Sequence, residues 1–119
     1  MKNFTGDVMA KDLNISMLMD FYGQLLSERQ YDMMDMYYNQ DLSLAEVAEE
    51  VEISRQGVRD SIKRGEKQLV GFEEKLGLAK RFSDITAQIE EMDKIINKLD
   101  DTDDVRKLKE ISQKLSEDI

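Results

Sequence analysis

Residues 42–69 carry two adjacent helix signatures separated by a short polar turn, and they constrain the fold more than any other part of the chain. Ser43 and Glu46 form an S-x-x-E capping box, which predicts a helix that starts at Leu44. After a turn at residues 52 and 53, Ser54 offers a second N-cap. Two short capped helices in this order predict a helix-turn-helix, a geometry that can place its second helix in a DNA major groove.

Apolar side chains recur at helical spacing in both predicted helices. This periodicity predicts that each helix buries one face, and that the two helices cross where these faces meet. The expected buried residues are Leu44, Val47, Ala48 and Val51 in the first helix and Val58, Ile62 and Leu69 in the second.

The opposite face of the second helix is the candidate nucleic-acid site. Arg55, Gln56 and Arg59 lie near the helix start, where side chains of a recognition helix meet base edges, and the later basic residues are suited to hold phosphates. A charged helix face is also the usual form of a solvated surface, which is the alternative interpretation. The predicted nucleic-acid-binding residues are Ser54, Arg55, Gln56, Arg59, Lys63, Arg64 and Lys67.

The charge distribution supports this location. The chain has 17 basic and 26 acidic residues and a net charge of -9. Residues 54–81 are nonetheless net +4, while residues 1–53 are net -8 and residues 82–119 are net -5. Because attraction to phosphates needs local positive potential, any contact with DNA, or with RNA, is expected on the second helix.

Two more helices are predicted before the motif. The first starts at Asn14 or Ser16, and the second follows an S-x-x-Q capping box formed by Ser27 and Gln30. The second helix of the motif is expected to continue past Leu69 and to stop at Gly77. Residues 14–76 are therefore expected to form an all-α helix-turn-helix bundle. The apolar stripe expected on its first helix is Ile15, Leu18, Met19, Tyr22, Leu25 and Leu26.

Residues 77–119 are expected to form a C-terminal helical extension. A long coiled-coil-type helix is predicted first, and a short terminal helix follows an acidic break at residues 100–104. We expect the apolar seam of the long helix to make the chain a homodimer; the alternative is that the terminal helix folds back over the seam as an intramolecular hairpin. The predicted oligomer interface is Phe82, Ile85, Ile89, Met92, Ile96 and Leu99.

The composition argues against catalysis. Histidine and cysteine are absent, and no glycine loop or carboxylate pair suggests a reaction, so we expect neither an enzyme, nor a cofactor, nor a metal site. The lack of cysteine fits a reducing cytoplasm. Since no apolar run approaches the length of a membrane span and no signal-peptide core is visible, we expect no membrane insertion.

Residues 15–70 resemble the sigma-factor domain that binds the promoter -35 element, through Ser27–Gln30, the pair Tyr37 and Tyr38, and the motif itself. Nearly the whole chain resembles the YlxM family of small bacterial helix-turn-helix proteins, chiefly through residues 54–66. The genes of that family lie beside those of the signal recognition particle GTPases. The resemblance implies a sigma-region-4-like fold and a regulatory role in that pathway. An alternative function is also left open, that of an adaptor that binds a protein or ribonucleoprotein component of the signal recognition particle.

One position departs from the usual motif. Many helix-turn-helix turns use glycine where Glu52 stands here, because that position often needs a positive φ. Glu52 is therefore expected either to adopt a strained backbone or to impose a different turn.

Overall fold

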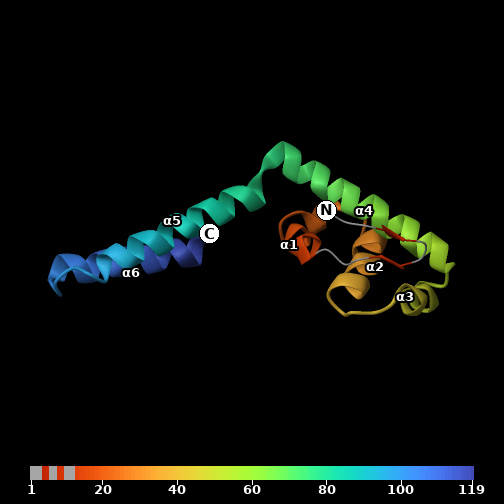
Figure 1. Ribbon diagram of the computed structural model, residues 1–119, viewed down its shortest axis with the longest axis horizontal. Coiled ribbons are helices and arrows are strands. Elements are labelled where there is room, and N and C mark those ends of the chain that lie inside the picture. The colour runs from red at the N-terminus through yellow and green to blue at the C-terminus, as the bar shows by residue number, and fades with distance from the viewer. Residues whose placement is uncertain (1–3, 6–7, 10–12) are drawn as a thin grey trace. The chain divides into compact units, whose positions relative to one another are not determined.

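The computed structural model describes residues 4–5, 8–9 and 13–119 and is built almost entirely from α-helices (Figure 1). The predicted all-α class is confirmed. The chain divides into two compact units, Met1–Gly77 and Leu78–Ile119. Each unit is described by itself below.

The first unit starts with a small hairpin that the sequence did not predict. Strand β1 (Phe4–Thr5) pairs antiparallel with β2 (Val8–Met9). Helix α1 (Leu13–Tyr22) follows and continues into a 3-10 turn, η1 (Gly23–Leu25). The prediction that Leu25 shares the buried stripe of α1 is wrong, since this side chain is 58% exposed. The tighter 3-10 turn ends the α-helical periodicity at Tyr22 and rotates Leu25 away from the core.

Capping residues set the starts of the next two helices as predicted. Helix α2 (Glu28–Tyr38) begins where the Ser27 hydroxyl accepts a hydrogen bond from the Gln30 N–H at 3.2 Å. Helix α3 (Leu44–Val51) has the full capping box: Ser43 Oγ accepts from the Glu46 N–H at 3.1 Å, and the Glu46 carboxylate accepts from the Ser43 N–H at 2.9 Å. The predicted box at Ser43 is confirmed in full, whereas at Ser27 only the N-cap bond is present, because the side-chain amide of Gln30 donates to the Ser61 carbonyl oxygen instead.

Helix α4 (Arg55–Leu76) organises the first unit, because α1, α2 and α3 all pack against it (Figure 1). The Ser54 hydroxyl accepts a hydrogen bond from the Gly57 N–H at 3.0 Å, and Gly77 ends the helix with a φ of 62°. Both predicted ends of the helix are confirmed. Among the residues expected in the core, Val51 and Ala48 are only half-buried, whereas the others are buried: Leu44, Val47, Val58, Ile62 and Leu69.

Gly65 allows α2 and α4 to approach closely. A β-carbon at this position would overlap the sulfur atom of Met34, a fully buried side chain of α2. Glycine in a helix interior costs about 1 kcal/mol relative to alanine. The close approach of the two helices explains why the chain accepts that cost here.

Tyrosines connect α1 and α2 to the C-terminal half of α4. The Tyr22 hydroxyl donates to the Glu73 carboxylate at 2.6 Å, and the Tyr38 hydroxyl donates to the carboxylate of the buried Glu66. Burial, followed by the charge of Glu66, raises the pKa of the Tyr37 phenol above its usual value. These side chains therefore belong to the core network of the first unit.

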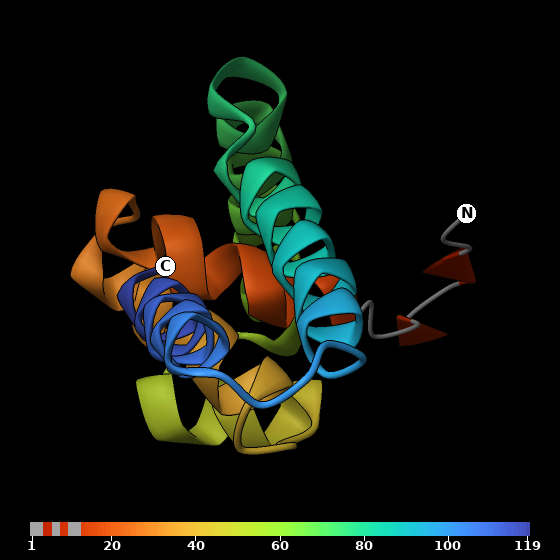
Figure 2. The same cartoon turned by 90° about the vertical axis from the view of Figure 1, so that its left-hand side faces the viewer.

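The second unit is a helical hairpin. Helix α6 (Asp103–Asp118) packs against α5 (Leu78–Ile96), and the loop that joins them faces the viewer in Figure 2. Within one chain the structure therefore has the hairpin that was the alternative to the dimer. Helix α5 ends at Ile96, so Leu99 lies in the connecting loop and is half exposed, outside the helical seam.

The acidic segment at residues 100–104, between α5 and α6, caps the start of α6. Thr102 Oγ1 accepts a hydrogen bond from the Val105 N–H at 3.2 Å and starts α6. Arg106 then pairs with Asp101 and with Asp103, each at 3.0 Å. Within the part of the chain that the structure describes, no group of acidic side chains is arranged to hold a metal ion.

Candidate nucleic-acid interface

The turn between α3 and α4 has the geometry of a helix-turn-helix. Glu52 adopts the left-handed conformation, with φ 58° and ψ 42°, and its N–H donates to the carbonyl oxygen of Ala48. Ser54 then starts α4. Of the two alternatives expected for Glu52, the structure has the strained one: a non-glycine residue adopts the positive φ.

All seven predicted nucleic-acid-binding residues lie outside the core of the first unit. Positions 56, 63 and 67 are spaced by seven and four residues, so they share one side of α4. Arg59 and Lys63 are half-buried. The other five are exposed: Ser54, Arg55, Gln56, Arg64 and Lys67. The structure therefore brings the predicted residues together on the outer surface of one helix, although the Ser54 hydroxyl already serves as the N-cap.

An acidic residue that the sequence analysis did not include lies within this basic surface. Asp60 is exposed on α4, and its carboxylate accepts a hydrogen bond from the Gln56 side-chain amide at 3.0 Å. The spacing of four residues between these side chains was the signal that could have revealed the pair. The bond to Asp60 occupies one of the two N–H donors of the Gln56 amide and leaves its second N–H and its oxygen for other partners.

Arg59 has an unsatisfied donor. Its Nε atom is buried and has no hydrogen-bond acceptor among the described residues. Buried donors are normally satisfied, and an exception calls for an explanation. Because this atom is buried, a ligand from solvent could supply the missing acceptor only if the Arg59 side chain moved.

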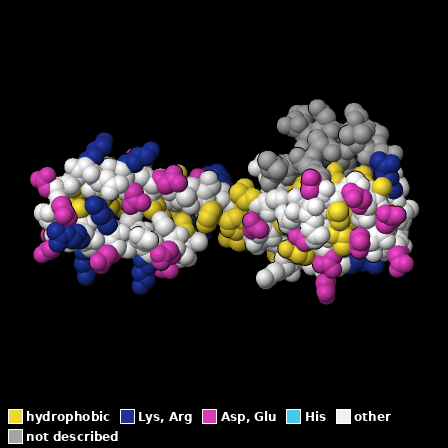
Figure 3. All heavy atoms as spheres, turned by 90° about the horizontal axis from the view of Figure 1, so that it is seen from below, with side chains coloured by type: hydrophobic (Ala, Val, Ile, Leu, Met, Phe, Trp, Pro, Cys, Tyr) yellow, Lys and Arg dark blue, Asp and Glu magenta, His cyan; other side chains and the backbone are white. Residues whose placement is uncertain are grey.

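Exposed acidic side chains lie on the first unit outside α4. On α3, Leu44 and Val47 face the core, whereas Glu46, Glu49 and Glu50 are exposed on other sides of the helix. On the face of the first unit seen in Figure 3, most of the charged side chains are acidic. Nucleic acid would therefore be attracted to α4 locally and repelled by its surroundings.

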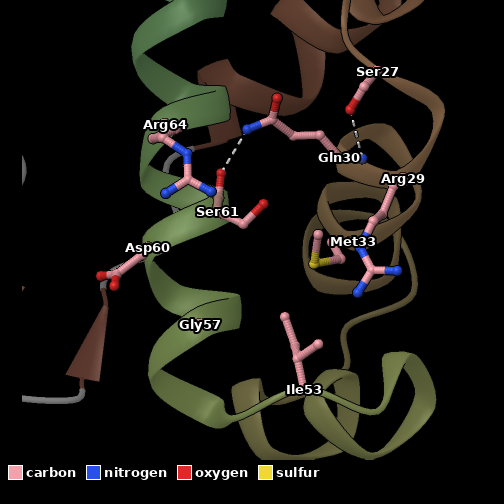
Figure 4. A pocket seen from close by; sticks show the side chains of 9 residues that line it. All are labelled: Ser27, Arg29, Gln30, Met33, Ile53, Gly57, Asp60, Ser61 and Arg64. Carbon is pink, nitrogen blue, oxygen red and sulfur yellow. Dashed lines mark hydrogen bonds between the residues drawn. The ribbon is translucent and has the colours of Figure 1, made fainter.

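A pocket of about 440 Å³ between α2 and α4 adds a basic residue that the sequence analysis missed (Figure 4). Arg29 on α2 and Arg64 on α4 stand on its opposite walls, and Met33 and Ile53 form an apolar part of the lining. Arg29 could not be predicted because it lies outside the motif, and only the packing of α2 on α4 brings it close. The other lining residues are Ser27, Gln30, Gly57, Asp60 and Ser61.

The fold and this surface define a helix-turn-helix protein. No helix in the described part of the chain is long and apolar enough to cross a membrane. Residues 9–117 match the model of the UPF0122 family, described as "Putative helix-turn-helix protein, YlxM / p13 like". The chain belongs to this family, which confirms the resemblance inferred from the sequence.

Relatives match over most of their length. A UPF0122 protein of Acetivibrio thermocellus is 42% identical over 113 residues, covering 92% of this chain and 97% of the relative. One from Clostridium perfringens strain SM101 is 46% identical over 110 residues, covering 92% and 96%. One from Thermoanaerobacter sp. strain X514 is 48% identical over 82 residues, covering 69% and 70%. These similarities support the family and its fold.

Proposed function

We propose that this protein is a regulatory protein that binds DNA through the exposed face of α4. The observation that carries the proposal is the collection of basic and amide side chains on the outer surface of one N-capped helix, directly after a helix-turn-helix turn. In this interpretation Arg55, Gln56 and Arg59 bind base edges, while Lys63, Arg64 and Lys67 bind phosphates.

Salt dependence tests this proposal. A protein that neutralises phosphates releases counterions, so its affinity for a mixed-sequence DNA duplex should fall steeply as salt rises. Fluorescence anisotropy at several salt concentrations measures the slope. A flat slope would contradict the proposal.

A second candidate function is an adaptor that uses the same fold to bind a protein or ribonucleoprotein, with components of the signal recognition particle as the partners suggested by the family resemblance. The exposed glutamates of α3 favour this candidate, because they repel phosphates and are available to a basic protein partner. Binding to a purified protein component with a shallow salt slope, together with no binding to duplex DNA, would favour the adaptor.

We also propose that residues 77–119 form a homodimer interface. Ile89 and Ile96 of the predicted seam are buried within the hairpin, so a partner would have to contact other apolar side chains. Such side chains remain exposed in both helices and in the loop between them: Phe82, Ile95, Leu99, Leu108, Ile111 and Leu115. A two-fold dimer would supply two copies of α4 for paired half-sites.

A further inference from the structure

A second pocket extends the one between α2 and α4. It has a volume of about 300 Å³ and is lined by Gln30, Arg64, Lys67 and Gln68. Gln30 and Arg64 line both pockets, so the two are neighbours along α4, and we call them together the α2–α4 groove.

The α2–α4 groove is long enough for a polymer. It follows α4 from Gly57 to Gln68, a span of about 16 Å at the rise of an α-helix. One strand of a duplex carries a phosphate about every 3.4 Å along its axis. The groove is therefore better matched to a stretch of nucleic-acid backbone than to a single small anion.

The charged lining favours an anion. Arg29, Arg64 and Lys67 contribute three cationic groups from two helices, against the single carboxylate of Asp60. In Figure 4 the side chains of Arg29 and Arg64 lie along α2 and α4, one on each side of the space between these helices. Planar guanidinium groups suit the bidentate binding of phosphate oxygens.

The walls of the groove are held in place without using these cations. The Gln30 side-chain amide donates to the Ser61 carbonyl oxygen at 2.8 Å, and Ser27 caps α2 through the Gln30 N–H. The first bond joins α2 to α4, and the second fixes the start of α2. Arg29 and Arg64 are both exposed, so a ligand can reach them from solvent.

We propose that the α2–α4 groove binds a segment of the phosphodiester backbone of the nucleic acid that contacts α4. Arg29 and Arg64 bind its phosphate groups from the two sides of the groove. This inference rests on the proposed function and extends the binding surface from the recognition helix to the N-terminal end of α2. Contacts of this kind fix register and orientation without reading sequence.

The test compares Arg29→Ala with Arg81→Ala, an exposed arginine of α5 that lies in the other unit. The probe is a mixed-sequence DNA duplex, and the readout is the slope of log affinity against log salt. Arg29→Ala should reduce the slope by about one unit, as expected for one lost phosphate contact, whereas Arg81→Ala should not change it. Helical circular dichroism should be unchanged in both variants.

The variant Asp60→Asn should change the affinity for DNA in the opposite direction to Arg29→Ala. It removes the one carboxylate of the groove, so the affinity should rise, while Glu110→Gln on α6 should have no effect. If Arg29→Ala and Arg81→Ala have the same slope, the proposal that the groove binds a phosphodiester backbone is wrong. If wild-type protein still binds with a steep slope in that case, the proposed function stands; if it shows no salt-dependent binding, both proposals are wrong.

Discussion

The side-chain amide of Gln30 donates a hydrogen bond to the backbone carbonyl oxygen of Ser61 at 2.8 Å, and this bond joins α2 to the first half of α4. Gln30→Ala removes it, and the free energy of unfolding should fall by about 1 kcal/mol, the usual net value of such a bond. Urea denaturation measures the change. Gln88→Ala on the exposed surface of α5 is the matched control, and equal stability of the two variants would contradict a structural role for the Gln30 bond.

Two glycines of α4 should respond oppositely to the same substitution. Gly65→Ala forces a β-carbon against the sulfur atom of Met34 and should lower stability, despite the better helix propensity of alanine. Gly71→Ala has nothing within 4 Å of the new β-carbon and should raise stability by about 0.5–1 kcal/mol. Thermal denaturation of the two variants side by side checks the contrast. Stabilisation by both changes would mean that α2 and α4 do not approach this closely.

Features that depend on residues close together in the sequence could be predicted, whereas those that depend on tertiary contacts could not. The helix starts at residues 44 and 55 and the stop at Gly77 depend on side chains within a few positions of the helix end, so capping rules located them. The place of Glu52 in the motif left two alternatives, a strained backbone or a different turn, and the structure has the first.

Features that depend on tertiary packing were missed. Arg29 joins the surface of α4 only because α2 packs beside it, and no pattern within α2 marks that residue. Leu25 was wrongly placed in the core because the change from α-helix to 3-10 turn after Tyr22 breaks the period on which the prediction relied. The heptad seam predicted a dimer with a hairpin as the alternative, because periodicity shows that a helix face is covered and does not identify what covers it.

Acid should weaken the start of α3. The hydrogen bonds from the Ser43 backbone N–H and then from its side chain lower the pKa of Glu46 from its ordinary value. A lowered pKa in the folded state gives a stabilising contribution that is present above the unfolded value and is lost as the pH falls through the folded value. Glu46→Gln should therefore lose less stability between neutral and acidic pH than the wild type does.

Glu49→Gln is the charge-matched control for this experiment, since it lies on the same helix outside the capping box. Denaturant midpoints measured across the acidic range give the two profiles. If Glu46→Gln and Glu49→Gln lose stability in parallel with the wild type, the capping carboxylate is not responsible for the acid dependence.

The exposed apolar side of α6 should drive dimerisation. Leu108, Ile111 and Leu115 are spaced by three and four residues and are 43%, 48% and 44% exposed. Covering apolar surface is favourable by about 25 cal/mol per Å². We expect sedimentation equilibrium at micromolar concentration to give twice the chain mass of 13.8 kDa, and Ile111→Glu to shift the protein to monomer.

Leu25→Glu, at an exposed leucine of the first unit, is the control and should leave the dimer intact. A mass of 13.8 kDa for the wild type over the whole concentration range would exclude the dimer. The protein would then present a single copy of α4 to its ligand.

The most direct test of the central claim is the affinity of the triple variant Arg55→Ala, Arg59→Ala and Lys63→Ala for a mixed-sequence DNA duplex at low salt. Each lost base or phosphate contact costs about 1–3 kcal/mol, so binding should weaken by about a hundredfold or more while helical circular dichroism stays unchanged. The charge-matched control replaces Lys107, Lys109 and Lys114 of α6 with alanine and should bind nearly as tightly as the wild type. Affinity of the α4 variant equal to that of the control would contradict nucleic-acid binding through α4.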